Sequence, residues 1–525
     1  MTVNRTSPRA LLIYPKFPHS FWNMPFLCGL KGARYPAPPL GLLTVAALLP
    51  PTWELRLADE NVRPLTAGDW EWAELILLSA MITQWPRLRQ VIREAKARGK
   101  TVVVGGPLAS SLPEKMLDLG ADFVVRGEAE HTLAPFLAAW EGGGSGGVFE
   151  AADKPDLRDS PLPRYDLIRV QEYGGLAVQT CRGCPFDCEF CDVVSLFGRK
   201  PRYKSPEQVI AELEALYRLG WRDDVFIVDD NFIGNPAHAR EILAHITKWQ
   251  AERQEPFTFW TQASVNLAQD RDLIDRMTAA NFSHVFIGVE SPDPEVLRGA
   301  HKHQNIAHPL VESLCTIRDN GLTIVGSFIM GFDNETPGVG ERIAALVDAA
   351  ALPNAILHIL TPLPNTRLWH RLKEEGRLEE DRFWKHNDDM QAVEWSLFFR
   401  PTRPAAEILE EFHRLGQYLY NRPSFMKRAY RYFLAMRPTR AALARAQGQP
   451  PPPDAGSAPP PSLEKIVQDL SRFCRLAWRQ GVKPAARRQY WSQFFSLLRR
   501  NPSRMVGYLK SMAMAEEVLL MQESL

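Results

Sequence analysis

The sequence has few cysteines for its size, no long apolar run and no excess of one charge. Seven cysteines in 525 residues are too few for a disulfide-stapled scaffold. No apolar stretch approaches the ~18 residues of a membrane span, and the N-terminus lacks the apolar core and cleavage site of a signal peptide. The net charge of +1 indicates no nucleic-acid or membrane partner for the chain as a whole. We therefore expect a cytoplasmic protein in a reducing environment, with roughly two to four domains.

Short apolar runs alternate with helix-like segments in the first part of the chain. Five such runs predict the strands of a parallel sheet, at 10–15, 53–59, 74–81, 101–106 and 122–127. We expect an open doubly wound α/β domain over residues 1–145. Such sheets bind ligands beyond the carboxyl ends of their strands, where small residues let a bulky cofactor approach the backbone. The predicted strand ends carry Pro15, Ser79, Gly105, Gly106, Pro107, Gly127 and Glu128. Glycines that only form turns are the alternative.

A second α/β series follows a linker. EGGGSGG at 141–147 is flexible by composition, and residues 146–165 are assigned to the connector. Six more strands are expected, at 176–180, 224–230, 257–263, 284–290, 323–331 and 355–362. Their regular alternation with helices predicts an open or partial six-stranded α/β barrel over residues 166–395, with its chemistry at the carboxyl ends of the strands. An eight-stranded barrel stays open as an alternative.

Beyond residue 395 the strand pattern stops. Residues 405–446 and 462–521 predict helices, and a proline-rich linker is assigned to 448–462. We expect residues 396–525 to form a mostly helical C-terminal domain. This region is the one strongly basic part of the chain and is rich in aromatic residues. Such side chains suit RNA or an anionic lipid surface, and a solvated face without a partner is also open.

Four of the seven cysteines lie in the segment TCRGCPFDCEFCDV. Cys184, Cys188 and Cys191 have the spacing C-x3-C-x2-C just after the first predicted barrel strand, so that one loop can direct three thiolates at one point. A zinc site prefers a fourth Cys or His ligand and separated cysteine pairs. An iron-sulfur cluster tolerates three protein ligands when another molecule binds the last iron. The spacing therefore favours an iron-sulfur cluster with one open position.

This segment resembles the cysteine motif of the radical SAM superfamily. In that family the three cysteines hold a 4Fe-4S cluster, and S-adenosylmethionine (SAM) binds the fourth iron. The resemblance implies that Cys184, Cys188 and Cys191 are the metal ligands and form the catalytic centre. Because the family pattern needs only three ligands, a packed thiol is favoured at Cys181, although a fourth-ligand role stays open.

Later segments resemble further motifs of the superfamily, in the family's order. VDDNF at 228–232 is similar to the segment that accepts hydrogen bonds from the SAM ammonium group, and IGVES at 287–291 to the one that reaches the ribose and methionine groups. VGSFIMGF at 325–332 resembles the glycine segment against which adenine packs, and LTPLPNTRLW at 360–369 the closing motif. The cofactor-binding residues implied are Asp229, Asp230, Glu290, Ser291, Gly326 and Gly331.

A doubly wound domain before a radical SAM barrel is the layout of the cobalamin-binding class of this superfamily. The resemblance implies cobalamin-binding positions at Gly105, Gly106, Pro107, Gly127 and Glu128. The chain has no D-x-H-x-x-G motif, and His19 is the one imidazole near the first predicted strand, so we expect cobalamin without a protein histidine beneath the cobalt. The C-terminal region is similar to the extra helical domain of the branch that includes hopanoid C-methylases.

The resemblance implies an enzyme that uses a 4Fe-4S cluster, SAM and cobalamin. Its expected reaction is methylation of an unactivated carbon in an apolar substrate of hopanoid, terpenoid or tetrapyrrole type. Its expected partners are an electron donor such as flavodoxin or ferredoxin and, through the basic C-terminal helices, a membrane surface. A non-methylating oxidase or cyclase of the same class is one alternative. An RNA-modifying enzyme is another, but the N-terminal domain has only Cys28 where such enzymes carry cysteines for a second cluster. No nucleic-acid partner is therefore expected.

Overall fold

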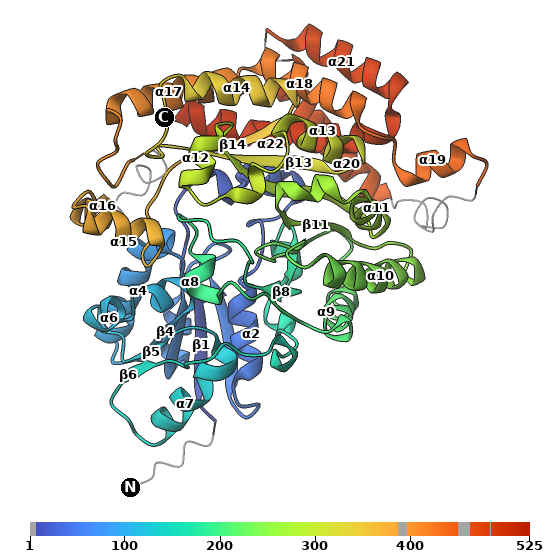
Figure 1. The fold of residues 1–525 in the computed structure, drawn as a ribbon. Helices are drawn as coiled ribbons and strands as arrows, with labels where there is room; N and C mark the ends of the chain where they lie inside the picture. Colours follow the sequence, from blue (N-terminus) through green and yellow to red (C-terminus); the bar gives the residue numbers. More distant parts are fainter. Residues whose placement is uncertain (1–6, 387–395, 450–462, 483–484, 525) are drawn as a thin grey trace.

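The chain folds into two parallel sheets, one above the other, and a helical region that covers the second sheet. A computed structural model describes residues 7–386, 396–449, 463–482 and 485–524. The N-terminal sheet lies at the bottom of Figure 1, the second sheet lies above it, and the C-terminal helices cover the top. The doubly wound sheet, the partial barrel and the helical C-terminal region are all confirmed.

The N-terminal sheet has six parallel strands in the order β2-β1-β3-β4-β5-β6. Its central strands are buried on both faces, as their continuous Leu, Ile and Val runs require. The strands are β1 (Arg9–Tyr14), β2 (Glu54–Asp59), β3 (Leu75–Ser79), β4 (Thr101–Gly105), β5 (Phe123–Val125) and β6 (Gly147–Phe149). The helices are α1 (Pro25–Lys31), α2 (Leu40–Leu48), α3 (Ala67–Trp72), α4 (Trp85–Ala97), α5 (Gly106–Ser111), α6 (Pro113–Asp118) and α7 (Ala129–Glu141). In sheets with this strand order, ligands bind beyond the carboxyl ends of the strands, near the place between β1 and β3 where the order reverses.

Strand β6 was not among the five predicted strands. It begins at the last glycine of the segment predicted as a flexible linker and pairs with β5, so the N-terminal sheet extends past residue 145. Phe149 holds it in place, with its ring 6.0 Å from that of Phe123 and 6.1 Å from that of Phe136. Three residues are too short for a periodicity to be visible in the sequence.

The second sheet also has six parallel strands, in the order β14-β13-β12-β11-β10-β7. Its strands are β7 (Leu176–Val178), β10 (Asp224–Ile227), β11 (Thr258–Ala263), β12 (Phe282–Glu290), β13 (Thr323–Met330) and β14 (Asn354–Ile359). Because β7 and β14 are the two edges, the sheet is an open barrel of six strands, and the eight-stranded alternative is wrong for the described residues. The helices are α8 (Val193–Phe197), α9 (Pro206–Arg218), α10 (Pro236–Glu252), α11 (Arg271–Ala279), α12 (Pro294–Gly299), α13 (Leu310–Asp319), α14 (Val339–Ala349), α15 (Arg367–Glu374) and α16 (Glu380–His386).

The two faces of the second sheet differ in what covers them. One face carries buried aliphatic and aromatic residues that pack in the core with the helices of the barrel. The other, inner face carries half-buried rings: Phe226 stacks on Trp260 with centroids 3.7 Å apart, and Trp260 stacks on His284 at 5.1 Å. Alternation along each strand separates the two sets.

The C-terminal region consists of helices, as predicted. They are α17 (Ala405–Leu419), α18 (Arg422–Ala435), α19 (Arg440–Ala446), α20 (Leu463–Ala477), α21 (Arg487–Arg500) and α22 (Met505–Ser524), with a π-helical turn at Trp478–Val482. Of the linker predicted at 448–462, residues 450–462 lie outside the described part of the chain. Within the described residues, no helix is both long enough and apolar enough to cross a membrane.

The last helix, α22, covers the inner face of the second sheet together with the N-terminal segment. Asn354 Nδ2 of β14 donates to Ser511 Oγ at 3.1 Å, and the backbone N–H of Leu27 donates to Glu517 Oε1 at 2.6 Å. Trp22 lies flat against His358, with centroids 6.1 Å apart. In Figure 1 the dark-blue N-terminal segment reaches up to this red helix. The segment around Trp22 and Leu27 and the last helix therefore close the barrel together.

Candidate functional site

The three predicted cluster ligands lie on one loop at the carboxyl edge of the second sheet. The loop runs from β8 (Cys181–Arg182) to β9 (Arg202–Tyr203), and these two strands pair antiparallel and close its base. Its middle is fixed from both sides, since the Glu189 N–H donates to the Ala300 carbonyl and the Leu368 N–H donates to the Glu189 carbonyl, each at 3.0 Å. The cysteine side chains themselves are half-buried.

Gly183 explains why the R-G-C sequence precedes the first ligand. Its φ of +93° is left-handed, and an added Cβ would lie 2.9 Å from the carbonyl oxygen of Gly198. Its N–H donates to Asp230 Oδ2 at 2.8 Å. Any other residue would strain this turn and displace the loop that carries the cysteines.

The thiols suit a cluster rather than a single ion. Burial raises the pKa of Cys184 and of Cys191, so both are protonated near neutral pH until a metal replaces the proton. Gln304 Nε2 lies 3.7 Å from Cys188 Sγ and donates to it. No three His, Cys, Asp or Glu side chains of the described chain are arranged around one metal ion. In a 4Fe-4S cluster each thiolate binds its own iron, so three separated thiols on one loop fit that group.

Cys181 differs from the three predicted ligands because it is fully buried, whereas they are half-buried. Its Sγ contacts the backbone oxygen of Asn231 at 4.0 Å, and burial raises its pKa well above the usual range. This environment is that of a packed, inert thiol.

The two aspartates after β10 have different surroundings. Asp229 is fully buried, and its carboxylate accepts the N–H groups of Thr180 and Cys181 at 2.7 and 3.0 Å and the Thr180 hydroxyl. Asp230 accepts only the N–H of Gly183, and its Oδ1 has no hydrogen-bond partner among the described residues. Burial raises the pKa of Asp230 to about 6. Asp229 thus holds the end of β7, whereas Asp230 is held through one oxygen alone.

Glu290 ends β12 in a strained conformation. Its φ of +63° is unusual for a residue with a side chain, and its Oε1 accepts Lys302 Nζ at 2.7 Å. Although burial acts to lower it, the pKa of Lys302 is raised, chiefly by the neighbouring Glu290 carboxylate. Ser291 is fully buried next to this pair, and its Oγ accepts the Asp293 N–H. Backbone strain of this kind is commonly stored at functional sites.

The two predicted adenine-packing glycines lie in different places. Gly331 follows β13 at the carboxyl edge with a φ of +107°, and an added Cβ there would lie 3.2 Å from Leu397. Gly326 is in the middle of β13, and an added Cβ would point to Leu352 at 3.4 Å. Leu352 belongs to the core on the helix-covered side. The structure therefore brings Gly331, but not Gly326, to the site.

A cavity of about 260 Å³ lies between the two sheets, over the carboxyl ends of β3, β4 and β5. Small and apolar side chains make up most of its wall. All five positions expected from the cobalamin-binding resemblance line it: Gly105, Gly106, Pro107, Gly127 and Glu128. The segments at the carboxyl edge of the second sheet, including the loop that carries the cysteines, contribute Gln179, Arg182, Leu196, Phe197 and Val228. The cavity thus lies between the N-terminal domain and the cysteine loop.

The wall of this cavity fits a flat macrocycle. Gly106 has a φ of +82°, and an added Cβ would lie 2.2 Å from Ser79 Oγ, so the backbone approaches the neighbouring strand without a side chain between them. No histidine is among the lining residues, and His19 is exposed elsewhere. The small residues leave room for a bulky ring system against the strand ends.

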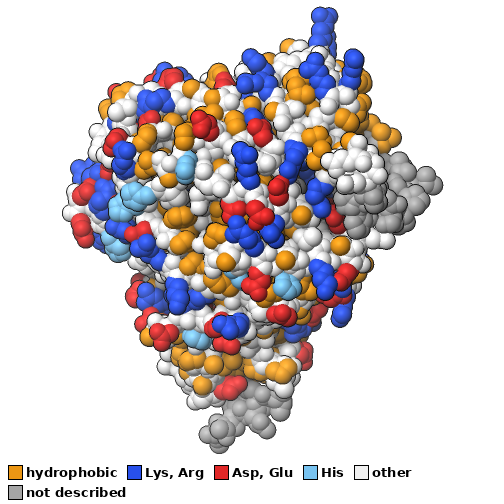
Figure 2. All heavy atoms as spheres, turned by 45° about the vertical axis from the view of Figure 1, so that its right-hand side comes forward, with side chains coloured by type: hydrophobic (Ala, Val, Ile, Leu, Met, Phe, Trp, Pro, Cys, Tyr) orange, Lys and Arg blue, Asp and Glu red, His pale blue; other side chains and the backbone are white. Residues whose placement is uncertain are grey.

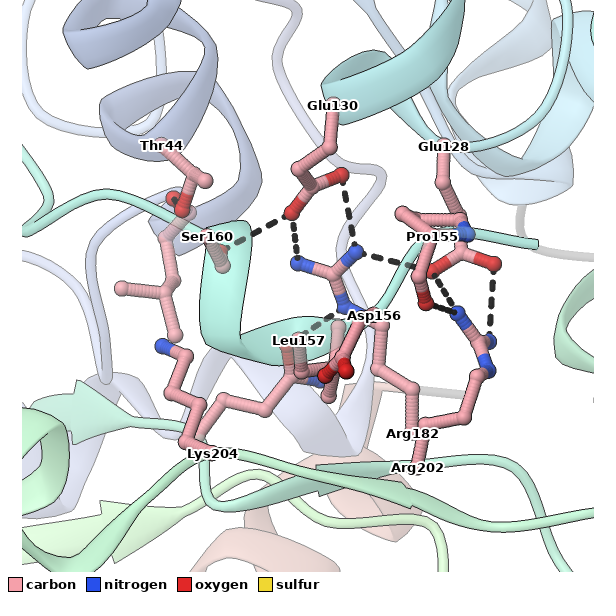
Figure 3. A network of polar contacts seen from close by, with 12 residues as sticks. Thr44, Glu128, Glu130, Pro155, Asp156, Leu157, Ser160, Arg182, Arg202 and Lys204 are labelled. Atoms are coloured by element: carbon pink, nitrogen blue, oxygen red, sulfur yellow. Dashed lines mark hydrogen bonds and ion pairs between the residues drawn. The ribbon is translucent and has the colours of Figure 1, made fainter.

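Buried ion pairs cross from the N-terminal domain to the cysteine loop (Figure 3). Arg182 donates to Glu128 Oε2 at 2.9 Å and to Glu130 Oε2 at 3.0 Å. Arg202 donates to both oxygens of Glu128, at 2.9 and 2.8 Å. Ser160 of the connector donates to Glu130 Oε1 at 2.9 Å. We call Glu128, Glu130, Arg182 and Arg202 the seam network.

Charges in the seam network compensate one another. Although burial acts to raise it, the pKa of Glu130 lies below its usual value because Arg182 pairs with the carboxylate. Glu128 is 3% and Arg182 11% exposed at the side chain, so removing one partner would leave a buried charge unpaired. Glu128 lines the cavity, but its carboxylate oxygens are already engaged by arginines.

Several residues of the site were not identified from the sequence. They are Thr180, Arg182, Arg202, Glu130, Lys302 and Gln304. The repeated acid in GEAE at 127–130 and the arginine before Gly183 were visible signals. No sequence signal indicated Lys302, because nothing in the sequence shows that it pairs with Glu290.

Three family models match successive parts of this chain. They are a B12 binding domain at residues 30–137, the radical SAM superfamily at 178–347 and a domain of unknown function, DUF4070, at 366–525. The radical SAM match implies a 4Fe-4S cluster and SAM, and the B12 match implies cobalamin.

Whole proteins with the same layout are similar over most of their length. An uncharacterized methyltransferase from Synechocystis sp. is 42% identical over 515 residues, which cover 98% of this chain and 92% of that protein. The hopanoid C-2 methylase of Rhodopseudomonas palustris is 34% identical over 397 residues, 73% of this chain and 74% of that one. The solved structure of the radical S-adenosylmethionine methyltransferase TsrM from Kitasatospora setae, with cobalamin and a 4Fe-4S cluster bound, has a TM-score of 0.58 at 17% identity and covers 70% of this chain and 78% of that one. This last likeness is one of fold.

Proposed function

Because this chain belongs to the B12-binding radical SAM methyltransferases, we propose that it methylates an unactivated carbon of an apolar, polycyclic substrate. Hopanoids, other terpenoids and tetrapyrroles are the substrate types that this chemistry suits. The methyltransferase relatives named above support the transfer of a methyl group. The choice of an apolar substrate rests on the inner face of the second sheet.

The inner face is aromatic along its middle, and at one end Asp224 of β10 pairs with Lys31 and Lys510 beside His284. Phe226, Trp260 and Phe286 contribute rings, and burial lowers the pKa of His284 and His358 to about 4, so that both imidazoles are neutral near pH 7. The rings of the inner face offer stacking surface to a flat hydrocarbon, and its charged side chains are already paired with one another. This single observation supports the apolar substrate class.

We propose the following roles for the site residues. Cys184, Cys188 and Cys191 hold the cluster. Asp230 and Glu290, with Ser291 and Gly331 beside them, orient SAM, while Asp229 supports them by fixing the end of β7. The small residues of the cavity wall hold cobalamin. When bound, the cluster and SAM supply a radical that takes hydrogen from the substrate, and cobalamin supplies the methyl group. The buried loop and the cavity wall exclude water from this chemistry. We propose functional units at residues 1–145, with β6 (Gly147–Phe149) completing the first, at 166–395 and at 396–525.

A mass-labelled assay tests this proposal. The full chain is reconstituted anaerobically with iron, sulfide and hydroxocobalamin and then incubated with a reductant, SAM carrying a deuterated methyl group and a neutral-lipid extract. We expect an apolar product that gains one labelled methyl group. A matched enzyme with Cys184→Ala serves as the control and forms none. An apolar product that changes mass without gaining the label would instead indicate a non-methylating oxidase or cyclase.

We also propose that a flavodoxin- or ferredoxin-like protein supplies electrons. Arg199 and Arg367 flank Asp187 on the cysteine loop, and their side chains are 58% and 54% exposed. Exposed cations beside the cluster loop complement the acidic surface of such donors. Arg199→Glu should slow reduction by a protein donor severalfold and leave reduction by dithionite unchanged. Equal slowing with both reductants would contradict this role.

The enzyme would meet a water-insoluble substrate at a lipid surface. We propose that peripheral membrane contact is made through the basic C-terminal helices.

A further inference from the structure

Exposed apolar side chains are concentrated in one part of the C-terminal region. Six large hydrophobic residues between positions 470 and 506 are strongly exposed: Leu470 (59%), Trp478 (56%), Val482 (44%), Phe495 (60%), Leu498 (46%) and Val506 (68%). They are six of the thirteen exposed large hydrophobic residues in the described part of the chain, and such a concentration marks an interaction surface.

Five of these residues lie on α20, on α21 and on the turn after α20, while Val506 lies on α22 and lines a different cavity. Leu470, Cys474 and Trp478 are spaced by four residues, so they share one side of α20 and the turn that follows it. Phe473 of α20 lies 6.5 Å from Trp491 of α21, and Trp491 stacks on Phe495 at 5.8 Å. The aromatic contacts join the two helices, and we call their exposed side the α20–α21 face.

Arginines border the α20–α21 face. Helix α21 begins with Arg487 and Arg488 and ends with Arg499 and Arg500, all exposed, and its sequence RRQYWSQFFSLLRR contains no acidic residue. At the top of Figure 2, where α21 lies, projecting Lys and Arg side chains stand next to hydrophobic ones. The face therefore combines a hydrophobic centre with a positively charged border.

We propose that the α20–α21 face docks on an anionic lipid bilayer. Trp, Phe and Leu side chains enter the boundary between headgroups and acyl chains, and the arginines pair with lipid phosphates, as in amphipathic helices that lie in a membrane interface. This inference deepens the proposed function, since it rests on an apolar substrate that resides in lipid.

Two other occupants fit the face less well. A second copy of the chain would bring the arginine borders of two α21 helices together, and like charges would oppose that contact. RNA would suit the arginines and the rings, but Leu470, Val482 and Leu498 are aliphatic and offer no stacking surface for bases. Lipid is the one partner that uses all the exposed side chains.

Vesicle sedimentation tests the docking without any cofactor. The full chain is mixed with phosphatidylcholine vesicles or with vesicles that also contain phosphatidylglycerol. We expect at least tenfold tighter binding to the anionic vesicles, weakened by salt. The double variant Phe495→Asp/Leu498→Asp should lose binding at least tenfold. The variant Leu162→Asp, which adds a charge at an equally exposed leucine (49%) in the connector, should bind as the wild type does.

Each other outcome overturns the proposal. Equal binding to neutral and anionic vesicles, or undiminished binding of the double variant, would show that the α20–α21 face does not dock on anionic lipid. A dimer in sedimentation velocity, or RNA retention in a gel shift, that is lost in the same double variant would assign the face to that partner instead. Methylation of a detergent-solubilised substrate tests the proposed function separately, since it needs no vesicle.

Discussion

The two parallel sheets have the same number of strands but are covered differently. The N-terminal sheet packs helices from its own domain on both faces, whereas the inner face of the second sheet is covered by Trp22 near the N-terminus and by α22 at the C-terminus. The first sheet is a closed core that presents only its strand ends. The second keeps a face of half-buried rings beneath a cover from distant parts of the chain. Under the proposed function, the strand ends of the first sheet hold cobalamin, and the ring-lined face of the second sheet receives the substrate.

Removing the three cysteines should have the largest effect and should change the second sheet alone. In the variant Cys184→Ala/Cys188→Ala/Cys191→Ala, the second sheet loses its metal ligands while the wall of the cavity stays intact. We expect complete loss of bound iron with cobalamin affinity within about twofold of wild type. Iron analysis and equilibrium dialysis of cobalamin check this. Loss of cobalamin together with iron would show that the two sheets do not bind their cofactors separately.

Arg182→Gln should weaken the contact between the N-terminal domain and the cysteine loop at the seam network. Breaking a buried, hydrogen-bonded ion pair costs about 3–5 kcal/mol, because Glu128 and Glu130 lose their shared partner. We expect a lower midpoint in urea unfolding and faster hydrogen exchange over residues 181–203. Arg34→Gln, which removes a pair whose arginine is 60% exposed, is the control and should change stability by less than about 1 kcal/mol. Equal effects of the two substitutions would contradict the role of the network.

Gly106→Ala should weaken cobalamin binding at the N-terminal sheet and leave the iron content unchanged. The added Cβ would collide with Ser79 at the cavity wall, so cobalamin affinity should fall about tenfold while iron content is kept. Gly120→Ala introduces similar left-handed strain at a φ of +97°, away from the cavity, and serves as the control. The account would be wrong if both variants weakened cobalamin binding equally.

Glu517→Gln should have the smallest effect. It should change how the stability of the α22 cover depends on pH. Burial raises the pKa of Glu517 to about 7, so the folded state binds the proton more tightly than the unfolded state does. Wild-type stability should therefore fall as pH rises from about 4.5 to 7, and the Gln variant should lack that slope. We expect it to be more stable than wild type at pH 8 by on the order of 1–3 kcal/mol. Thermal unfolding across this pH range measures the difference, and parallel curves would exclude the effect.

Sequence patterns predicted the sheets better than the contacts between them. Five N-terminal strands and six barrel strands were visible as short apolar runs, and the cysteine loop as a spacing. The role of α22 was not visible, because an apolar helix does not indicate which distant surface it covers. The Arg182–Glu128 pair joins residues 54 positions apart, and hydrophobic periodicity carries no information on such pairing. Gly326 was assigned to the site by motif, but its place on the helix-covered side of β13 depends on strand register.

The cysteine loop and the cavity lie on the two sides of the seam network. Electron paramagnetic resonance of the reconstituted full chain, with cobalamin as Co(II) and the cluster reduced, tests this directly. We predict that the Co(II) signal is broadened by magnetic interaction with the cluster and that the broadening disappears in the triple cysteine variant. A Co(II) signal identical in the two proteins would contradict the shared seam.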